Sequence, residues 1–270
     1  MQIKHWHIEG SKGELIHGST HEVDGQPTCN LLIAHGFKGY KEYGCFPWIA
    51  HQAALQGVRA HRFNFSHSGM LDGSGSFERP DLFELATWNT QVEDLQAVVP
   101  FCSDPEIPTI LLGHSRGGVA ILLAASRGSV HVDHLIPLAA PATCNPLSEE
   151  MQQTMLRQGY IESPSSRTDQ MLRIGRCFLD EQTADPAGHD LLSLVGTIDV
   201  PITVIHGDQD ETVPVSSGET LAKVARDATF NPIYGGTHVF NTPNPFPIEG
   251  EASPQLQRVW AVLSSIFPEQ

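Results

Sequence analysis

Short apolar runs alternate along this chain with segments whose apolar residues recur about every 3.6 positions. The runs predict buried strands at 28–34, 58–65, 108–113, 135–139, 202–206 and 229–234. The periodic segments predict helices at 46–56, 88–99, 118–127 and 255–267. The first 25 residues alternate polar and apolar positions between glycines, which is typical of an antiparallel hairpin at a sheet edge. Strands that alternate with helices predict an α/β fold, a mostly parallel sheet covered by helices.

One connection is much longer than the others. Residues 142–189 separate the fourth and fifth of the predicted core strands. A first helix is expected to begin at Asn145-Pro146 and to end at Gly159, and a second is expected at 168–179. Three of the five methionines of the chain lie in this insertion: Met151, Met155 and Met171. Methionine faces adapt to irregular ligands, which favours a lid over a binding site, whereas the plainer interpretation is that these residues pack onto the sheet.

Composition narrows the class of protein. The chain has 270 residues, of which 40% are hydrophobic and 17% charged, as in one ordinary globular α/β domain. Its formal net charge of −15 argues against nucleic acid and anionic membranes as partners. No signal peptide or membrane-spanning run is recognisable, and the five cysteines are scattered. A cytoplasmic protein with free thiols is therefore expected.

The first candidate catalytic motif is Gly113-His114-Ser115-Arg116-Gly117. This G-x-S-x-G pentapeptide follows a predicted strand and precedes a predicted helix, which is the form of a nucleophile elbow. In such an elbow the serine lies on a tight turn at the N-terminus of a helix, where the helix dipole favours developing negative charge. Ser115 is therefore the candidate nucleophile.

A serine nucleophile needs a base, and the base needs a carboxylate that orients it. Asp208 and Asp210 directly follow the strand at 202–206, and His238 follows the strand at 229–234. Carboxyl ends of parallel strands meet at one edge of the sheet, so these side chains are expected near Ser115. The order Ser115, Asp210, His238 is the order of α/β-hydrolases. Asp208 stays open as an alternative acid, although we expect it to bind backbone in its turn.

The remaining machinery is an oxyanion hole of two backbone N–H groups. Arg116 follows the nucleophile, and Phe37 lies in the His35-Gly36-Phe37 loop after the first core strand. We expect His35 to brace that loop. The histidine pairs of the chain lack companions at metal-ligand spacing, so no metal site is expected. The glycine-rich segment lacks a P-loop ending. The serine also excludes the dehalogenase and epoxide hydrolase chemistry that needs a carboxylate nucleophile.

These motifs resemble those of the α/β-hydrolase superfamily over nearly the whole chain. The motifs are His35-Gly36-Phe37, the strand 62–65, the elbow, the turn 207–214 and Gly236-Thr237-His238. Within it the chain is most similar to feruloyl/cinnamoyl-type carboxylesterases and their S9 peptidase-like relatives. Asn64 stands where relatives often carry Asp, and residues 66–69 depart from their pattern. The resemblance implies eight strands, a small helical insertion at 142–189 and Asp210 as the triad acid. Together with the chain length, this predicts one domain, 1–270, with a lid insertion at 142–189.

The sequence therefore predicts a serine hydrolase that cleaves small carboxylic esters through an acyl-enzyme, without metal or organic cofactor. Substrate contacts are expected from Phe37, Met151, Met155 and Phe240. One alternative is an aminopeptidase- or acylpeptide-like amide hydrolase, since the same triad cleaves amides. Another is a non-catalytic binding protein of the same fold. Acyl preference and oligomeric state are not readable from the pattern.

Overall fold

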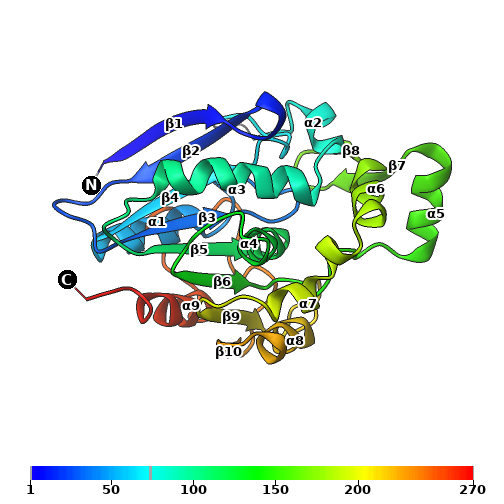
Figure 1. Ribbon diagram of the computed structural model, residues 1–270. Coiled ribbons are helices and arrows are strands. Elements are labelled where there is room, and N and C mark those ends of the chain that lie inside the picture. Colours follow the sequence, from blue (N-terminus) through cyan, green and yellow to red (C-terminus); the bar gives the residue numbers. More distant parts are fainter. Residues whose placement is uncertain (1, 73–74, 270) are drawn as a thin grey trace.

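A computed structural model describes residues 2–72 and 75–269, and its centre is an eight-stranded sheet (Figure 1). The strand order is β1-β2-β4-β3-β5-β6-β9-β10. The strands are β1 (Ile3–Glu9), β2 (Leu15–His21), β3 (Cys29–Ala34), β4 (Val58–Asn64), β5 (Thr109–His114), β6 (His134–Leu138), β9 (Ile202–Gly207) and β10 (Ala228–Ile233). Each of the six predicted core strands lies within one residue of its expected bounds.

The expected N-terminal hairpin is also confirmed. β1 and β2 pair antiparallel, β2 pairs antiparallel with β4, and every following pair is parallel. All residues of β3, β5 and β9 are buried, because helices cover both faces of a parallel sheet. This explains why these strands are continuous apolar runs in the sequence. The expected α/β-hydrolase fold with eight strands is thereby confirmed.

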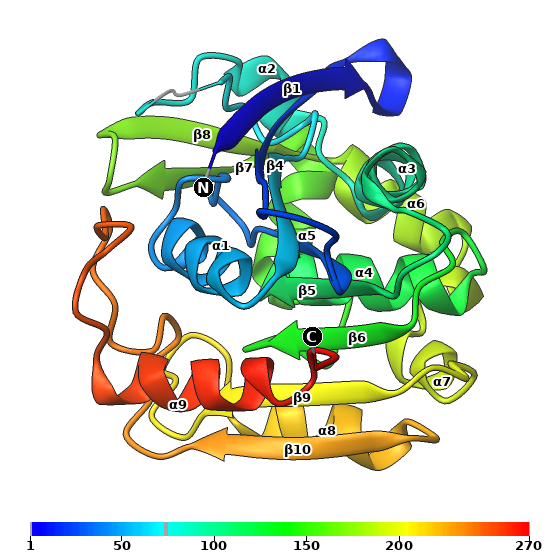
Figure 2. The same ribbon diagram turned by 90° about the vertical axis from the view of Figure 1, so that its left-hand side faces the viewer.

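The helices form a layer on each face of the sheet (Figures 1 and 2). α1 (Phe46–Leu55) and α9 (Pro254–Ser264) pack on one face and enclose one buried apolar cluster. α3 (Trp88–Cys102), α4 (Arg116–Ser126), α7 (Leu191–Val195) and α8 (Ser216–Val224) enclose the other. Shorter elements are α2 (Pro80–Glu84) and the 3-10 turns η1 (Ser11–Gly13) and η2 (Ala187–His189). Among the residues that the structure describes, no helix is both long and apolar enough to cross a bilayer.

The insertion lies beyond one end of the sheet (Figure 1). It contains α5 (Glu149–Gln158), β7 (Tyr160–Ser165), β8 (Gln170–Gly175) and α6 (Cys177–Ala184). α5 ends at Gly159 as expected, with a φ of 88°. Its start was predicted wrongly: Ser148 is the N-cap and accepts from Met151 N–H at 3.2 Å. The Asn145 side chain accepts instead from Leu147 N–H at 3.1 Å in a turn before the helix.

The second helix predicted in the insertion, 168–179, is also wrong. Residues 170–175 form strand β8, which pairs antiparallel with β7, and α6 begins only at Cys177. Along β8 the exposed Met171 precedes Leu172, which is buried against Met70, Phe77 and Phe83. Over six residues the apolar spacing fits a strand and a helix about equally well. The partner strand and the aromatic residues beneath it decide the conformation.

Candidate active site

Ser115 lies on the expected sharp turn between β5 and α4. Its φ and ψ are 53° and −119°, a conformation that a residue with a side chain adopts only under local constraint. The turn is held by Ser115 N–H, which donates to Leu138 O on β6 at 2.8 Å. A Cβ on Gly117 would lie 2.4 Å from Ala34 O, so only glycine allows α4 to approach β3 this closely. The local sequence thus places the serine at the N-terminus of α4.

His238 and Asp210 lie together at the same edge of the sheet. His238 Nδ1 is 2.7 Å from Asp210 Oδ2, so Nδ1–H donates and Nε2 is left as the basic nitrogen. The rings of His238 and His114 lie 4.8 Å apart, and His114 Nε2 donates to His238 O at 2.9 Å. Because His114 precedes Ser115 directly, these contacts attach the His238 loop beside the nucleophile turn.

The Asp210 carboxylate is almost saturated with donors. Its Oδ1 accepts from the N–H groups of Thr212 and Val213, both at 2.9 Å. Burial alone would raise the pKa of Asp210, but hydrogen bonds from His206, His238 and Val213 N–H lower this pKa below its usual range. Asp210 is therefore ionised and fixed in orientation. The alternative acid, Asp208, accepts from Gly235 N–H at 2.6 Å and ties two turns together.

His206 also contacts the acid, a role that the motifs in the sequence did not predict. This residue is fully buried at the end of β9, and its Nε2 lies 3.3 Å from Asp210 Oδ2 and 2.9 Å from Val213 O. One imidazole N–H is thus shared between the carboxylate and the turn that follows it. A histidine at the end of an otherwise apolar strand, four residues before the acid, is the signal that could have indicated this contact.

The loop after β3 is braced as expected by His35. His35 Nδ1–H donates to Gly36 O at 2.8 Å, and Phe65 N–H donates to His35 Nε2 at 3.1 Å. Burial lowers the pKa of His35 to about 4, so the ring is neutral at physiological pH. A Cβ on Gly36 would lie 3.0 Å from Ser115 Cβ, so the loop touches the nucleophile turn. In the described chain, the N–H groups of Phe37 and Arg116 have no hydrogen-bond acceptor.

A cavity of about 510 Å³ opens beside Ser115. It is lined mainly by apolar residues from the loop after β3, from α3, from the insertion including α6, and from the turn after β9. Two of the four expected contact residues, Phe37 and Met151, line it and are 39% and 40% exposed. The expectation for the other two is corrected. Met155 is fully buried against Ile161 and Leu179, and Phe240 is fully buried in the cluster beneath α9.

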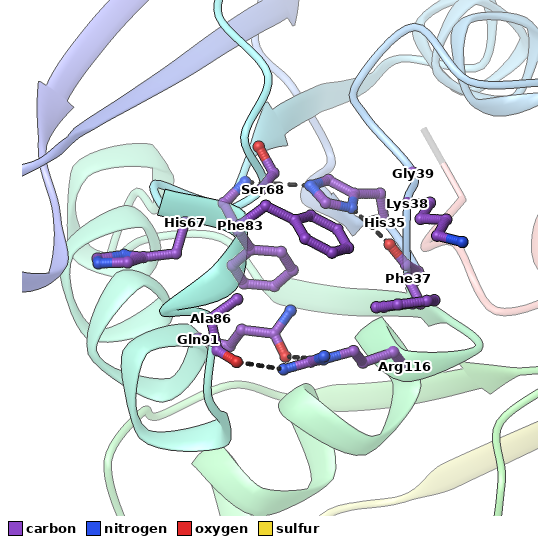
Figure 3. Close-up of a pocket in the computed structure, with 12 residues that line it drawn as sticks. His35, Phe37, Lys38, Gly39, His67, Ser68, Phe83, Ala86, Gln91 and Arg116 are labelled. Atoms are coloured by element: carbon purple, nitrogen blue, oxygen red, sulfur yellow. Dashed lines mark hydrogen bonds between the residues drawn. The ribbon is translucent and has the colours of Figure 1, made fainter. Parts of the chain in front are cut away.

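A second, much smaller cavity of about 20 Å³ lies against the same loop (Figure 3). It has room for about one water molecule. His35, Phe37, Gln91 and Arg116 contribute to its lining. Phe37 and Arg116 also line the large cavity, so their side chains form part of the wall of both. Over residues 2–72 and 75–269, no group of three His, Cys, Asp or Glu side chains could hold a metal ion.

The profile of the alpha/beta hydrolase family matches residues 16–248. The chain belongs to this family. A monoacylglycerol lipase from Mycolicibacterium smegmatis is 23% identical over 247 residues, covering 82% of this chain and 85% of the lipase. Est1E from Butyrivibrio proteoclasticus, solved with ferulic acid bound, superposes with a TM-score of 0.71 at 19% identity and 96% coverage of both chains. The esterase domain of a Rhodothermus marinus protein superposes with a TM-score of 0.65 at 24% identity, covering 98% of this chain and 97% of that one.

Proposed function

We propose that this α/β hydrolase cleaves carboxylic esters, with Ser115 as nucleophile, His238 as general base and Asp210 as the orienting acid. The observation that carries the proposal is the 2.7 Å contact between His238 and Asp210. His114 holds the loop that carries His238 beside the strained Ser115 turn. The volume of the cavity that Ser115 lines supports an ester of moderate size as substrate. The similarity to a lipase, to Est1E and to an esterase domain also supports an ester substrate.

In the proposed reaction His238 Nε2 takes the Ser115 proton as Oγ attacks the ester carbonyl carbon. The N–H groups of Phe37 and Arg116 stabilise the oxyanion, and the carbon–oxygen bond to the alcohol breaks as His238 returns the proton to it. Water then attacks the acyl-enzyme, its proton passing through His238 back to Ser115 Oγ, and the carboxylic acid leaves. The insertion acts as a lid whose Met151 contacts substrate. No metal or organic cofactor takes part.

Substitution of the nucleophile tests this proposal. Ser115→Ala is expected to lower kcat on p-nitrophenyl butyrate by roughly 10⁶-fold, as loss of a serine nucleophile does elsewhere, and to abolish labelling by a fluorophosphonate probe. Ser126→Ala, at the other end of α4, is the matched control and is expected to keep both. Retained turnover in Ser115→Ala, with an unchanged melting temperature, would refute the assignment. Parallel assays on p-nitroanilides show whether amides are cleaved instead.

A further inference from the structure

Among the described residues that line the cavity beside Ser115, one has a charged side chain, Arg116. Its guanidinium carbon lies 4.8 Å from the Trp88 ring, 5.0 Å from the Phe178 ring and 5.9 Å from the Phe37 ring. These three rings come from α3, the insertion and the loop after β3, and all of them line the same cavity. The cation therefore lies among aromatic rings in the wall of the proposed substrate site.

The hydrogen-bond partners of this guanidinium are neutral. Arg116 Nε donates to Gln91 Oε1 at 2.9 Å and Nη2 donates to Ala86 O at 3.3 Å, as Figure 3 shows. Gln91 and Ala86 thus fix the plane of the guanidinium. Within the described ranges, Nη1 makes no hydrogen bond and no carboxylate lies within 4.0 Å of the Arg116 side chain. Burial lowers the pKa of Arg116 to about 10, which still leaves it charged at neutral pH.

The negative charge of Glu181 raises the pKa of Arg116 and so offsets part of the effect of burial, but the Glu181 carboxylate accepts from the N–H groups of Trp88 and Asn89 and not from the guanidinium. The buried cation has therefore lost water without gaining a direct anionic partner. Its orientation is already fixed, so an arriving carboxylate would form a charge-assisted hydrogen bond at little further entropic cost. Because the side chain belongs to the residue after the nucleophile, that carboxylate would lie only a few bonds from the ester. An ester with an uncharged chain of the same length has no group that could pair with this guanidinium.

We propose that the cavity selects esters that also carry a carboxylate, which pairs with the Arg116 guanidinium. This inference rests on the proposed esterase function and names its class of substrate. The Arg116 backbone N–H serves the oxyanion, whereas its side chain acts on specificity. The chain has a net charge of −15, which repels anions at long range, so the comparison requires fixed ionic strength.

The test compares charged and uncharged esters of equal reach. Mono-4-nitrophenyl adipate places a carboxylate at the end of the acyl group, and 4-nitrophenyl heptanoate is its neutral counterpart. A second pair, 3-carboxy-4-nitrophenyl butyrate and 4-nitrophenyl butyrate, places the charge on the alcohol side. In at least one pair the unsubstituted enzyme is expected to prefer the carboxylate ester by about tenfold or more in kcat/KM. Equal or lower kcat/KM for the carboxylate ester in both pairs would overturn the proposal.

Variants then assign the preference to the side chain. In Arg116→Gln the ratio of kcat/KM values within the preferred pair is expected to fall to about one, chiefly through KM of the charged ester. Arg116→Lys is expected to keep part of the preference, since a point charge remains. Arg157→Gln removes an exposed charge from α5 and should leave the ratio unchanged. If Arg116→Gln lowered kcat/KM equally for both esters of the pair, the Arg116 side chain would act only on the structure of the site, and the inference would be refuted. Failure of the esterase proposal looks different, because the neutral ester would then not be cleaved at all.

Discussion

Two histidines outside the proposed triad hold His238 and Asp210 in position. His114 donates to the backbone of the His238 loop, and His206 donates to the carboxylate of Asp210. Chain order and position at strand ends were enough to predict Ser115, Asp210 and His238. Chain order could not predict the contacts that His114 and His206 make, because each contact joins two turns whose separation depends on how neighbouring strands pair.

His206 is expected to act as a positioning residue for the acid. His206→Leu removes one donor to Asp210, leaving the carboxylate with three, so we expect kcat to fall roughly tenfold with little change in KM. His206→Gln, which retains a side-chain N–H of similar reach, is expected to recover most of that loss. Steady-state kinetics on one p-nitrophenyl ester check both variants. Equal kcat in the Leu and Gln variants would show that the hydrogen bond to Asp210 has no effect on turnover.

At the scale of elements, the parallel core was predictable and the insertion was not. The strands β3, β5 and β9 are apolar runs buried on both faces, so their hydrophobicity alone marks them. β8 is half-buried and six residues long, and its pattern also fits a helix. Its conformation depends on pairing with β7 and on a small apolar cluster contributed by residues about 90 to 100 positions earlier. Local periodicity carries no information about such partners.

Substitutions of two methionines in α5 are expected to have opposite effects on stability and activity. Met155 is fully buried against Ile161 and Leu179, whereas Met151 is 40% exposed and lines the cavity. Met155→Ala is expected to lower the free energy of unfolding by about 2–4 kcal/mol, measured by urea denaturation, with acyl preference unchanged. Met151→Ala is expected to change that free energy by less than about 1 kcal/mol and to lower kcat/KM severalfold on longer acyl esters. The reverse pattern would mean that α5 presents its other face to the substrate.

The whole molecule buries several neutral histidines. Burial is the largest cause that lowers the pKa of His21, His61 and His114 to about 3 and that of His35 to about 4. The unfolded chain binds protons at these groups below about pH 6.5, so the stability they contribute is present above that pH and is lost as pH falls. Burial raises the pKa of Asp94 to about 7, which has the opposite sign. Four histidines outweigh one carboxyl group, so acid destabilises the fold.

The melting temperature is accordingly expected to fall by about 10 °C or more between pH 7.5 and pH 5.0. Circular dichroism at matched ionic strength measures it. In His61→Gln the difference between the two pH values is expected to shrink, because one buried group no longer takes up a proton on unfolding. His131→Asn changes an exposed histidine and serves as the control. A melting temperature that stays constant or rises on acidification would contradict this account.

The amino-acid pattern alone was sufficient for the alternation of strands and helices, the nucleophile turn and the order of the three proposed catalytic residues. These follow from local periodicity and from the rule that parallel strands end at one edge. Folding in three dimensions settled which side chains line the cavity and which are buried, as for Met151 against Met155. It also surrounded Arg116 with rings from three separate segments. Such environments are built from residues far apart in the chain, so no stretch of sequence contains them.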